Sequence, residues 1–281
     1  MRNGFSAGAI LALMALPAHG EVLPLSLDRG IAATFESPAG GGPFPAVLMF
    51  HGLGSSRDEV GIIFADTARA LAMDGIASLR IDFRGFGKSD GDTGAFTLER
   101  QNEDAAIALQ ALAAMDKVDA GHIGVMGFSF GAGAAIELAA AQPVAIKSLV
   151  VWAPVGNYHD DMLDSLGQRA FDLAARDGVV GLDLGWRTMA LKRGFFDSLD
   201  RHDLLAALRA YDGPFMAVNG SDDPYRKYTP ALMEAAGADK RAVVIEGGDH
   251  VFHVYTPSRS LAPKVIEATV ERFRNTLGGT R

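Results

Sequence analysis

Gly127-Phe128-Ser129-Phe130-Gly131 is a G-x-S-x-G pentapeptide that lies between a short apolar run, Ile123 to Met126, and a run of small residues, Gly133 to Ala141. A serine in this motif between a strand and a helix is typical of a nucleophile elbow, a strained turn that lifts the hydroxyl clear of the sheet. The flanking glycines suit such a turn because side chains beside it would collide. The motif therefore predicts Ser129 as a nucleophile if a base and an acid lie nearby. The alternative is an ordinary glycine-rich turn.

Apolar runs alternate with helical patterns on both sides of this motif, which predicts a mostly parallel central sheet with helices on both faces. The expected strands are Val22 to Leu27, Ile31 to Glu36, Ala46 to Phe50, Ile76 to Ile81, Ile123 to Met126, Ile146 to Val151, Phe215 to Val218 and Ala242 to Ile245. The expected helices are one opened by a capping box at Ser56-Arg57-Asp58-Glu59 and reaching about Met73, one capped by Thr97 and reaching Met115, Ser129 to Ala141, Tyr228 to Ala236, and Ala262 to Leu277.

One stretch, Val155 to Tyr211, interrupts this alternation and is called the cap segment below. It contains no good strand pattern and carries charges and aromatic residues in short helical pieces. Insertions of this kind are expected where loops leave the carboxyl ends of the strands, which is also where open α/β sheets bind ligands. We therefore expect an inserted helical cap over residues 155–211. The alternative is a helical extension that only covers the sheet.

The first twenty residues have the pattern of a cleavable signal peptide. Arg2 supplies a positive start, Phe5 to Leu16 is apolar, and Ala18-His19-Gly20 ends in small residues before Glu21. The apolar core is too short to span a bilayer of roughly 30 Å as a helix. The remainder, residues 21–281, is expected to form one α/β domain, because a chain of this size with 48% hydrophobic residues can bury a sizeable core. The sequence thus predicts a periplasmic or secreted protein.

Charge and cysteine content exclude several classes of function. The net charge is -8, and loss of the leader with its one Arg would make it -9, which disfavours nucleic acids and anionic membrane surfaces as partners. The chain has no cysteine, so it has no disulfide framework and no thiol nucleophile. We expect a small-molecule substrate and no stable membrane association. The composition predicts nothing about the oligomeric state.

A serine hydroxyl needs a base within hydrogen-bond reach and a carboxylate to orient that base. Two loops after expected strands supply candidates, Asn219 to Pro224 and Glu246 to His250. His250 is the favoured base among seven histidines, with His253 as its rival. Asp223, which precedes a proline, is favoured over the adjacent Asp222 as the acid.

A metal site and an oxyanion hole are the other features to consider. His250 and His253 lack a third and fourth ligand at a suitable spacing, so we predict neither a metal nor a cofactor. His122, His159 and His202 are read as surface or packing residues. His51-Gly52-Leu53-Gly54 follows the first core strand, where a plain turn is the alternative to an oxyanion loop. The expected oxyanion donors are the backbone N–H groups of Leu53 and Phe130.

These residues resemble the α/β-hydrolases, and within them the cinnamoyl and feruloyl esterase-like serine hydrolases. The likeness is carried by Ile76 to Gly91 (IASLRIDFRGFGKSDG), Val150 to Pro154 (VVWAP) and Gly213-Pro214. The resemblance implies an α/β-hydrolase fold with Ser129 as nucleophile, Asp223 as acid, His250 as base, and Leu53 with Phe130 as oxyanion donors. It also implies that Asp82, Arg84, Gly85 and Gly87 form turn architecture. The chain departs from the group at Phe128 and Phe130, so we expect the Phe130 ring in the pocket wall near the scissile bond.

The sequence therefore favours an exported serine hydrolase that cleaves carboxylic esters through an acyl-enzyme. Phe130, Trp186, Phe195 and Phe196 could line an apolar acyl or aryl pocket, or they could be packing residues of the cap. Two alternatives stay open. The same machinery could act as a peptidase, a thioesterase or a dienelactone-type lactonase, or the fold could be catalytically silent and serve in binding.

Overall fold

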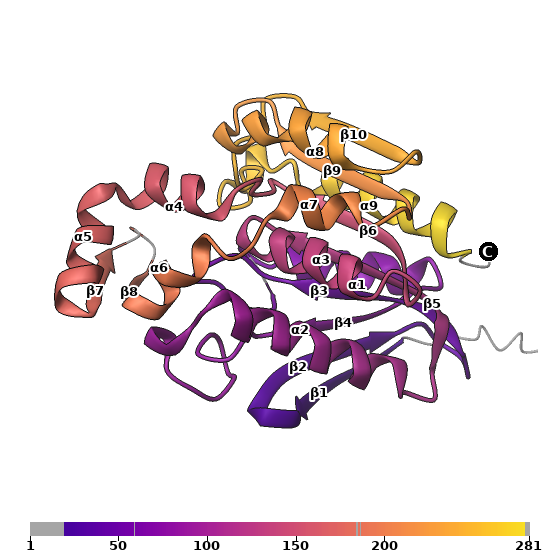
Figure 1. Cartoon of the computed structure of the whole chain (residues 1–281). Helices are drawn as coiled ribbons and strands as arrows, with labels where there is room; N and C mark the ends of the chain where they lie inside the picture. Colours follow the sequence, from indigo (N-terminus) through magenta and orange to yellow (C-terminus); the bar gives the residue numbers. More distant parts are fainter. Residues whose placement is uncertain (1–19, 59, 184, 186, 279–281) are drawn as a thin grey trace, which may run out of the picture.

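The computed structural model describes residues 20–278 except Glu59, Leu184 and Trp186, so residues 1–19 of the predicted signal peptide lie outside the described residues. Its centre is an eight-stranded sheet with the order β1-β2-β4-β3-β5-β6-β9-β10 (Figure 1). The strands are β1 (Glu21–Leu27), β2 (Ile31–Ser37), β3 (Phe44–Phe50), β4 (Ala77–Ile81), β5 (Val118–Phe128), β6 (Ile146–Trp152), β9 (Phe215–Gly220) and β10 (Lys240–Ile245). The pairings β1–β2 and β2–β4 are antiparallel and the other five are parallel, which confirms the predicted, mostly parallel sheet.

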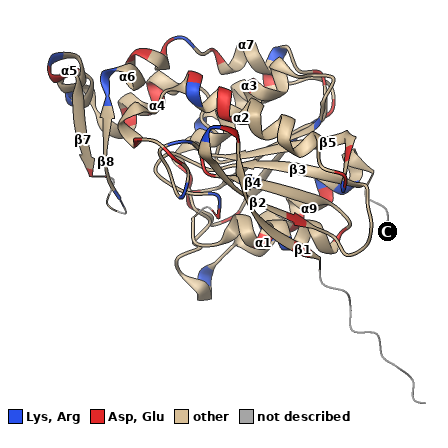
Figure 2. Cartoon of the chain, turned by 90° about the horizontal axis from the view of Figure 1, so that it is seen from below, with Lys and Arg blue, Asp and Glu red and all other residues tan. Residues whose placement is uncertain are grey.

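Helices cover both faces of this sheet. Figure 2 shows α1 (Ile63–Met73) and α9 (Ala262–Leu277) on one side, and α2 (Leu98–Ala113) and α3 (Phe130–Ala141) on the other. The helices α7 (Leu204–Arg209) and α8 (Thr229–Ala235) pack on the same side as α3. None of the helices in the described part of the chain is long and apolar enough to span a membrane.

Alternation along the central strands explains why two helical layers are needed. In β3, Ala46, Leu48 and Phe50 join the apolar cluster under α2 and α3, while Val47 and Met49 join the cluster under α1 and α9. Successive side chains of a strand point to opposite faces, so a strand that is apolar throughout must be covered twice. Full burial of each large side chain contributes about 1.5–3 kcal/mol. The result is a rigid sheet whose parallel strands all end at one edge.

The helix α1 begins later than the sequence pattern predicts. The expected helix start at Ser56 to Glu59 is wrong, because α1 starts at Ile63 and its N-cap residue Ile62 makes no side-chain cap. Glu59 of the predicted capping box lies outside the described residues. Arg57 is instead bound to the turn after β4: its backbone N–H donates to Asp82 at 2.6 Å, and its guanidinium also pairs with Asp82. The predicted cap of α2 is confirmed, since the Thr97 hydroxyl accepts from the N–H of Arg100 at 3.3 Å.

The cap segment between β6 and β9 contains a β-hairpin in addition to helices. Its elements before α7 are α4 (Tyr158–Leu166), α5 (Gln168–Asp177), β7 (Val179–Asp183), β8 (Thr188–Lys192) and α6 (Arg193–Leu199). The expectation of helical pieces without a strand is therefore wrong, because β7 and β8 pair antiparallel. Alternate side chains of the hairpin are buried, namely Val180 and Leu182 on one strand and Met189 and Leu191 on the other. This period of two is visible in the sequence, but each run is only five residues long.

Candidate active site

Ser129 lies in a strained turn between β5 and α3. Its backbone has φ 53° and ψ -118°, a region that L-residues avoid at a cost of about 1–3 kcal/mol. The flanking glycines permit this geometry, since a Cβ on Gly127 would lie 2.2 Å from the carbonyl oxygen of Gly131. A Cβ on Gly131 would lie 2.3 Å from the carbonyl oxygen of His51. The turn can therefore form only with glycine at positions 127 and 131.

The structure brings Ser129, His250 and Asp223 together in a chain of hydrogen bonds. His250 Nε2 lies 3.1 Å from Ser129 Oγ, and His250 Nδ1 lies 3.0 Å from Asp223 Oδ1. A carboxylate can only accept, so we assign the ring proton to Nδ1. The lone pair of Nε2 is then directed at the serine hydroxyl. These residues follow β5, β9 and β10, whose carboxyl ends lie at the same edge of the sheet.

Asp223, and not Asp222, faces the imidazole. The Asp223 side chain is fully buried and accepts from the Tyr225 backbone N–H at 3.0 Å and from Asn219 Nδ2 at 3.2 Å. Asn219 is itself held by the Thr229 hydroxyl at 2.8 Å. Asp222 is exposed and accepts instead from the hydroxyl of Ser221. The buried carboxylate therefore has three donors that fix its orientation toward His250.

Aromatic rings and a second buried acid surround the histidine. The His250 ring contacts Phe128, at 5.2 Å between centroids, and Tyr225, at 4.3 Å. Tyr225 also reaches the cap segment, where its hydroxyl lies 3.1 Å from Ser165 Oγ. Asp161, on the same helix, is 3% exposed. Burial raises the pKa of Asp161 to about 6, against the opposing effects of the Tyr225 hydroxyl and His250. Sequence reasoning missed both Tyr225 and Asp161, because only the fold brings α4 to the His250 loop.

The two backbone groups expected to stabilise an oxyanion lie on segments beside Ser129. Phe130 is the first residue of α3, and the N–H groups of a helix's first turn have no partner within the helix. Their partial positive charge suits a developing anion. Leu53 follows Gly52, at which an added Cβ would lie 3.3 Å from Ser129 Cβ. The loop after β3 therefore passes directly beside the serine.

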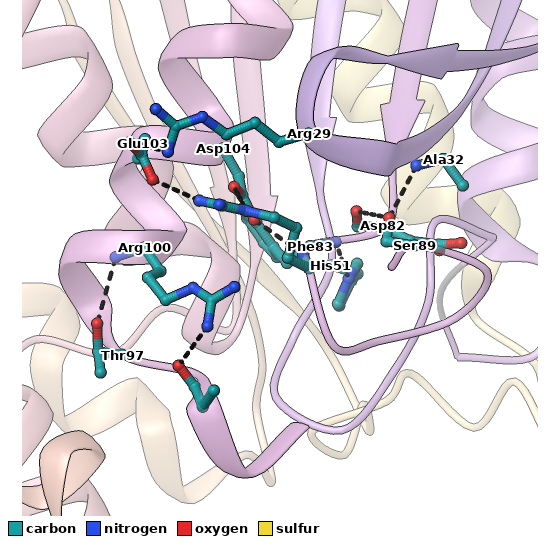
Figure 3. Close-up of polar contacts among 12 residues, drawn as sticks. Arg29, Ala32, His51, Asp82, Phe83, Ser89, Thr97, Arg100, Glu103 and Asp104 are labelled. Atoms are coloured by element: carbon teal, nitrogen blue, oxygen red, sulfur yellow. Dashed lines mark hydrogen bonds and ion pairs between the residues drawn. The ribbon is translucent and has the colours of Figure 1, made fainter. Parts of the chain in front are cut away.

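His51 holds the loop after β3 in place through hydrogen bonds of its ring. The sequence did not predict this role. Its ring is 1% exposed. Nδ1 lies 2.8 Å from the carbonyl oxygen of Gly52, and Nε2 lies 3.0 Å from the backbone nitrogen of Phe83 and accepts its hydrogen bond (Figure 3). Burial is the main reason that the pKa of His51 is lowered to about 4. The neutral ring thus joins the loop after β3 to the turn after β4. The sequence shows a histidine at the strand end, but not its partner 32 residues away.

The residues of the turn after β4 hold backbone and side chains in place. Asp82 accepts from the N–H of Lys88 at 2.8 Å and pairs with Arg57. Arg84 binds the carboxylates of Asp104 and Glu103 on α2. Gly85 and Gly87 have φ of 88° and 53°, the left-handed region that favours glycine. None of these contacts involves Ser129 or His250.

The Phe130 ring lies in the core. It is 1% exposed and packs on Tyr158, with 4.7 Å between centroids, and on Phe195, at 5.8 Å. Because this ring is enclosed by aromatic side chains of the cap segment, the expectation that it forms an open pocket wall is wrong. Phe195 and Phe196 are also buried, and Trp186 lies outside the described residues. Phe130, Phe195 and Phe196 therefore provide packing for the cap segment.

The other candidate histidines make local contacts. His253 Nε2 lies 2.9 Å from the carbonyl oxygen of Gly247, and its Nδ1 lies 3.0 Å from Asp249. His122, His159 and His202 each face a carboxylate. Within residues 20–278, apart from the three positions left out, no group of three or more His, Asp and Glu side chains could hold a metal ion.

A family model and several known proteins match parts of this chain. A family model described as "Serine aminopeptidase, S33" matches residues 41–179, which include the elbow and the loop after β3 but neither Asp223 nor His250. Esterase FrsA of Yersinia pestis is 28% identical over 232 residues, 79% of this chain and 52% of that protein. An uncharacterized 31.7 kDa protein in the traX-finO intergenic region of Escherichia coli is 34% identical over 124 residues, 44% of this chain and 42% of that protein. The chain thus spans about half or less of the length of these relatives.

Solved structures extend the likeness over nearly the whole chain. Est1E from Butyrivibrio proteoclasticus, solved with bound ferulic acid, has a TM-score of 0.73 at 21% identity and covers 91% of this chain and 99% of its own. A dienelactone hydrolase from Anabaena variabilis has a TM-score of 0.59 at 19% identity and covers 92% of this chain and 99% of its own. At these identities the likeness concerns the fold. Together with the strand, turn and helix around Ser129, these matches show that the chain has the α/β-hydrolase fold.

Proposed function

We propose that this protein is a serine hydrolase that cleaves carboxylic esters with Ser129 as nucleophile, His250 as general base and Asp223 as the orienting acid. The observation that supports the proposal most is the hydrogen-bonded series Ser129 Oγ, His250 Nε2, His250 Nδ1 and Asp223 Oδ1. A hydroxyl becomes a useful nucleophile only when a base can take its proton as it attacks. Both contacts that this requires are already made.

The proposed reaction passes through an acyl-enzyme. Ser129 Oγ attacks the ester carbonyl while His250 Nε2 takes the hydroxyl proton, and the resulting imidazolium is stabilised by Asp223. The negative charge on the carbonyl oxygen is bound by the N–H groups of Leu53 and Phe130, each worth about 3 kcal/mol of the barrier. The C–O bond then breaks and His250 protonates the departing alcohol. Water, deprotonated by the same histidine, then attacks the acyl carbon. The bond to Ser129 Oγ breaks, His250 returns the proton to this oxygen, and the acid is released.

Esters are proposed over amides because FrsA is named an esterase and Est1E was solved with ferulic acid. The description of the matching family model as a serine aminopeptidase favours aminoacyl amides as the second candidate. Export is part of the same proposal and rests on the sequence of residues 1–20 alone.

Turnover of matched substrates tests the bond type. We expect the protein to hydrolyse short-chain para-nitrophenyl esters and feruloyl esters with kcat/KM well above that for aminoacyl amides or thioesters, measured by absorbance under the same conditions. Ser129→Ala should lower kcat by about 10⁶-fold. Hydrolysis of amides alone would overturn the ester assignment.

The two adjacent aspartates provide an internal control for the acid. Asp223→Asn should lower kcat by about 10³–10⁴-fold, because an amide cannot hold the imidazole in the required tautomer. Asp222→Asn should leave kcat within about twofold, since its exposed carboxylate contacts only Ser221. The reverse order of the two effects would contradict the proposed catalytic arrangement.

A further inference from the structure

A cavity of about 430 Å³ adjoins the loop that carries the proposed oxyanion donor Leu53. Its lining begins at the next residue, Gly54, and includes Ser55, Ser56 and Tyr255. Consecutive Cα atoms are about 3.8 Å apart, so a molecule held by the Leu53 backbone reaches this cavity within a few bonds. The volume is sufficient for one small substituent of a substrate.

The cavity contains one cationic side chain, Arg187, at the end of the cap-segment hairpin where β8 begins. The Arg187 guanidinium donates to the carbonyl oxygen of Gly54 at 3.2 Å and lies over the Phe86 ring at 5.5 Å from its centroid. Both contacts leave most of its five N–H donors available. The cation is thereby held in a fixed orientation beside the loop that passes Ser129.

Arg187 has no carboxylate partner among the described residues, whereas three other cations near the cap segment do. Arg57 pairs with Asp82, Lys192 with Asp92, and Arg201 with Glu99. A guanidinium that only had to attach the hairpin to the core would gain more from a carboxylate than from one carbonyl oxygen. The open donors therefore suit an anion that arrives with the substrate.

The ligand chemistry follows from the charge and shape of this group. A single guanidinium matches a carboxylate in charge and in its planar, two-oxygen geometry, whereas a phosphate dianion calls for more than one cation. The hydroxyls of Ser55, Ser56 and Tyr255 can hydrogen-bond the same group. Because the chain as a whole carries a net charge of -8, an anionic substrate would need such a local cation.

We propose that Arg187 binds a carboxylate on the substrate, so that the enzyme prefers esters that carry a second, free carboxylate close to the scissile bond. This inference rests on the proposed hydrolase activity and specifies its substrate class. The carboxylate is carried either by the acyl group, as in a monoester of a dicarboxylic acid, or by the alcohol.

A pair of esters that differ only at the chain end tests the preference. Mono-para-nitrophenyl glutarate carries a carboxylate where para-nitrophenyl pentanoate carries a methyl group. We expect a higher kcat/KM for the glutarate, and a fall of about 10- to 100-fold in the glutarate-to-pentanoate ratio in Arg187→Met, the range for a hydrogen bond to a charged group. Carboxylated and plain phenyl acetates test the alcohol side in the same way.

The control is Arg176→Met, which removes an exposed arginine of α5 that pairs with Asp177. Its substrate ratios should equal those of the wild type. Arg187→Lys should restore part of the preference, because it keeps the charge but not the planar geometry. Arg187→Met could instead change the rates for charged and neutral esters equally, both in the acyl series and in the alcohol series. Arg187 would then serve only to attach the hairpin, and the proposal would be overturned.

Binding without turnover separates this inference from the proposed function. Monomethyl glutarate should bind the Ser129→Ala protein by calorimetry, and Arg187→Met in that background should weaken this binding about 10-fold or more. If this binding depends on Arg187 but the wild-type protein hydrolyses no ester, the hydrolase proposal is refuted and the carboxylate site is kept. Ester hydrolysis in which Arg187 affects neither selectivity nor binding would refute the carboxylate site and keep the hydrolase proposal.

Discussion

His51 shows how a single buried side chain positions the proposed site. Its two ring nitrogens join the carbonyl of Gly52 to the N–H of Phe83, so it connects the loop beside Ser129 to the next strand's turn. This arrangement requires a neutral ring with its proton on Nδ1. Burial disfavours the charged ring and is the main reason that the pKa of His51 is lowered to about 4. Protonation of Nε2 would also remove the acceptor of the Phe83 N–H.

His51 should therefore make stability depend on pH. Its pKa is about 4 in the folded protein and 6.5 in the unfolded chain, so between these values the unfolded chain binds more protons. Its contribution is fully present above about pH 6.5 and is lost as the pH falls to about 4, by about 3 kcal/mol in total. In urea unfolding at pH 7 and pH 4.5, His51→Gln should lose less stability than the wild type. Asp161 titrates in the same range in both proteins, so its contribution cancels when their pH-dependent changes in stability are compared.

His51→Phe separates the ring's charge from its hydrogen bonds. It cannot titrate, so its pH dependence should match that of His51→Gln. It also leaves the Phe83 N–H buried without an acceptor, which should lower the free energy of unfolding at pH 7 by a further 1–3 kcal/mol or so. A wild-type pH slope in both variants would show that His51 is not the titrating group.

The residues of the proposed triad could be predicted because residue type and chain order carry the information. Ser129 is marked by its motif, and Asp223 and His250 stand in loops just after strands. His51, Tyr225 and Asp161 could not be assigned their contacts in this way. Each acts on a partner that is distant in sequence, and only the packed structure defines those pairs.

At the scale of elements, the turn around Ser129 depends on close backbone contact between β5, α3 and the loop after β3. Gly131 is the point of closest approach, because a Cβ there would lie 2.4 Å from the carbonyl oxygen of Phe50 and 2.3 Å from that of His51. Backbone atoms cannot move aside as a flexible side chain can. The helix and the strand would have to separate.

Gly131→Ala should consequently destabilise the protein by about 3 kcal/mol or more, through overpacking against backbone. Gly181→Ala is the matched control: Gly181 lies in β7 of the cap segment, with no atom within 4 Å of its added Cβ. We expect the control to change stability by less than about 1 kcal/mol. Thermal and urea unfolding measure both, and a Gly131→Ala protein as stable as the control would contradict the proposed role of the elbow glycines.

The elements that sequence patterns missed were those decided by tertiary contacts. Ser56 to Glu59 has the composition of a helix start, but the backbone N–H and the guanidinium of Arg57 both bind Asp82 in the turn after β4. The hairpin of β7 and β8 alternates correctly, yet its runs are short and lie among helices. By contrast, the continuous apolar run of β3 and the helical period of α9 matched the sequence-based expectation closely.

At the scale of the whole molecule, helices cover both faces of the sheet, so the proposed site lies at the edge where the parallel strands end. The central strands are apolar on both faces, so the alternation of strands and helices was sufficient to predict this arrangement. The same fold extends over 91% of the chain in the comparison with Est1E at only 21% identity. Such divergence keeps the scaffold while loops and the cap segment change, which is why the fold could be predicted and the substrate could not.

The cap segment contributes side chains on several sides of the proposed site. Its aromatic residues enclose Phe130, its helix α4 reaches Tyr225, and its hairpin brings Arg187 to the loop after β3. Specificity is therefore expected to follow from contacts made by this segment, with Ser129, His250 and Asp223 held by the sheet. A carboxylate preference at Arg187 is the most specific form of that expectation.

The central claim is that Ser129 is an activated nucleophile, and its covalent labelling tests this most directly. The folded protein is treated with a fluorophosphonate probe, and the adduct is located by intact mass and peptide mapping. We expect one adduct on Ser129, none in Ser129→Ala, and labelling slowed by about 10²-fold or more in His250→Ala. A folded protein whose Ser129 stays unlabelled would contradict the account and favour a catalytically silent binding protein.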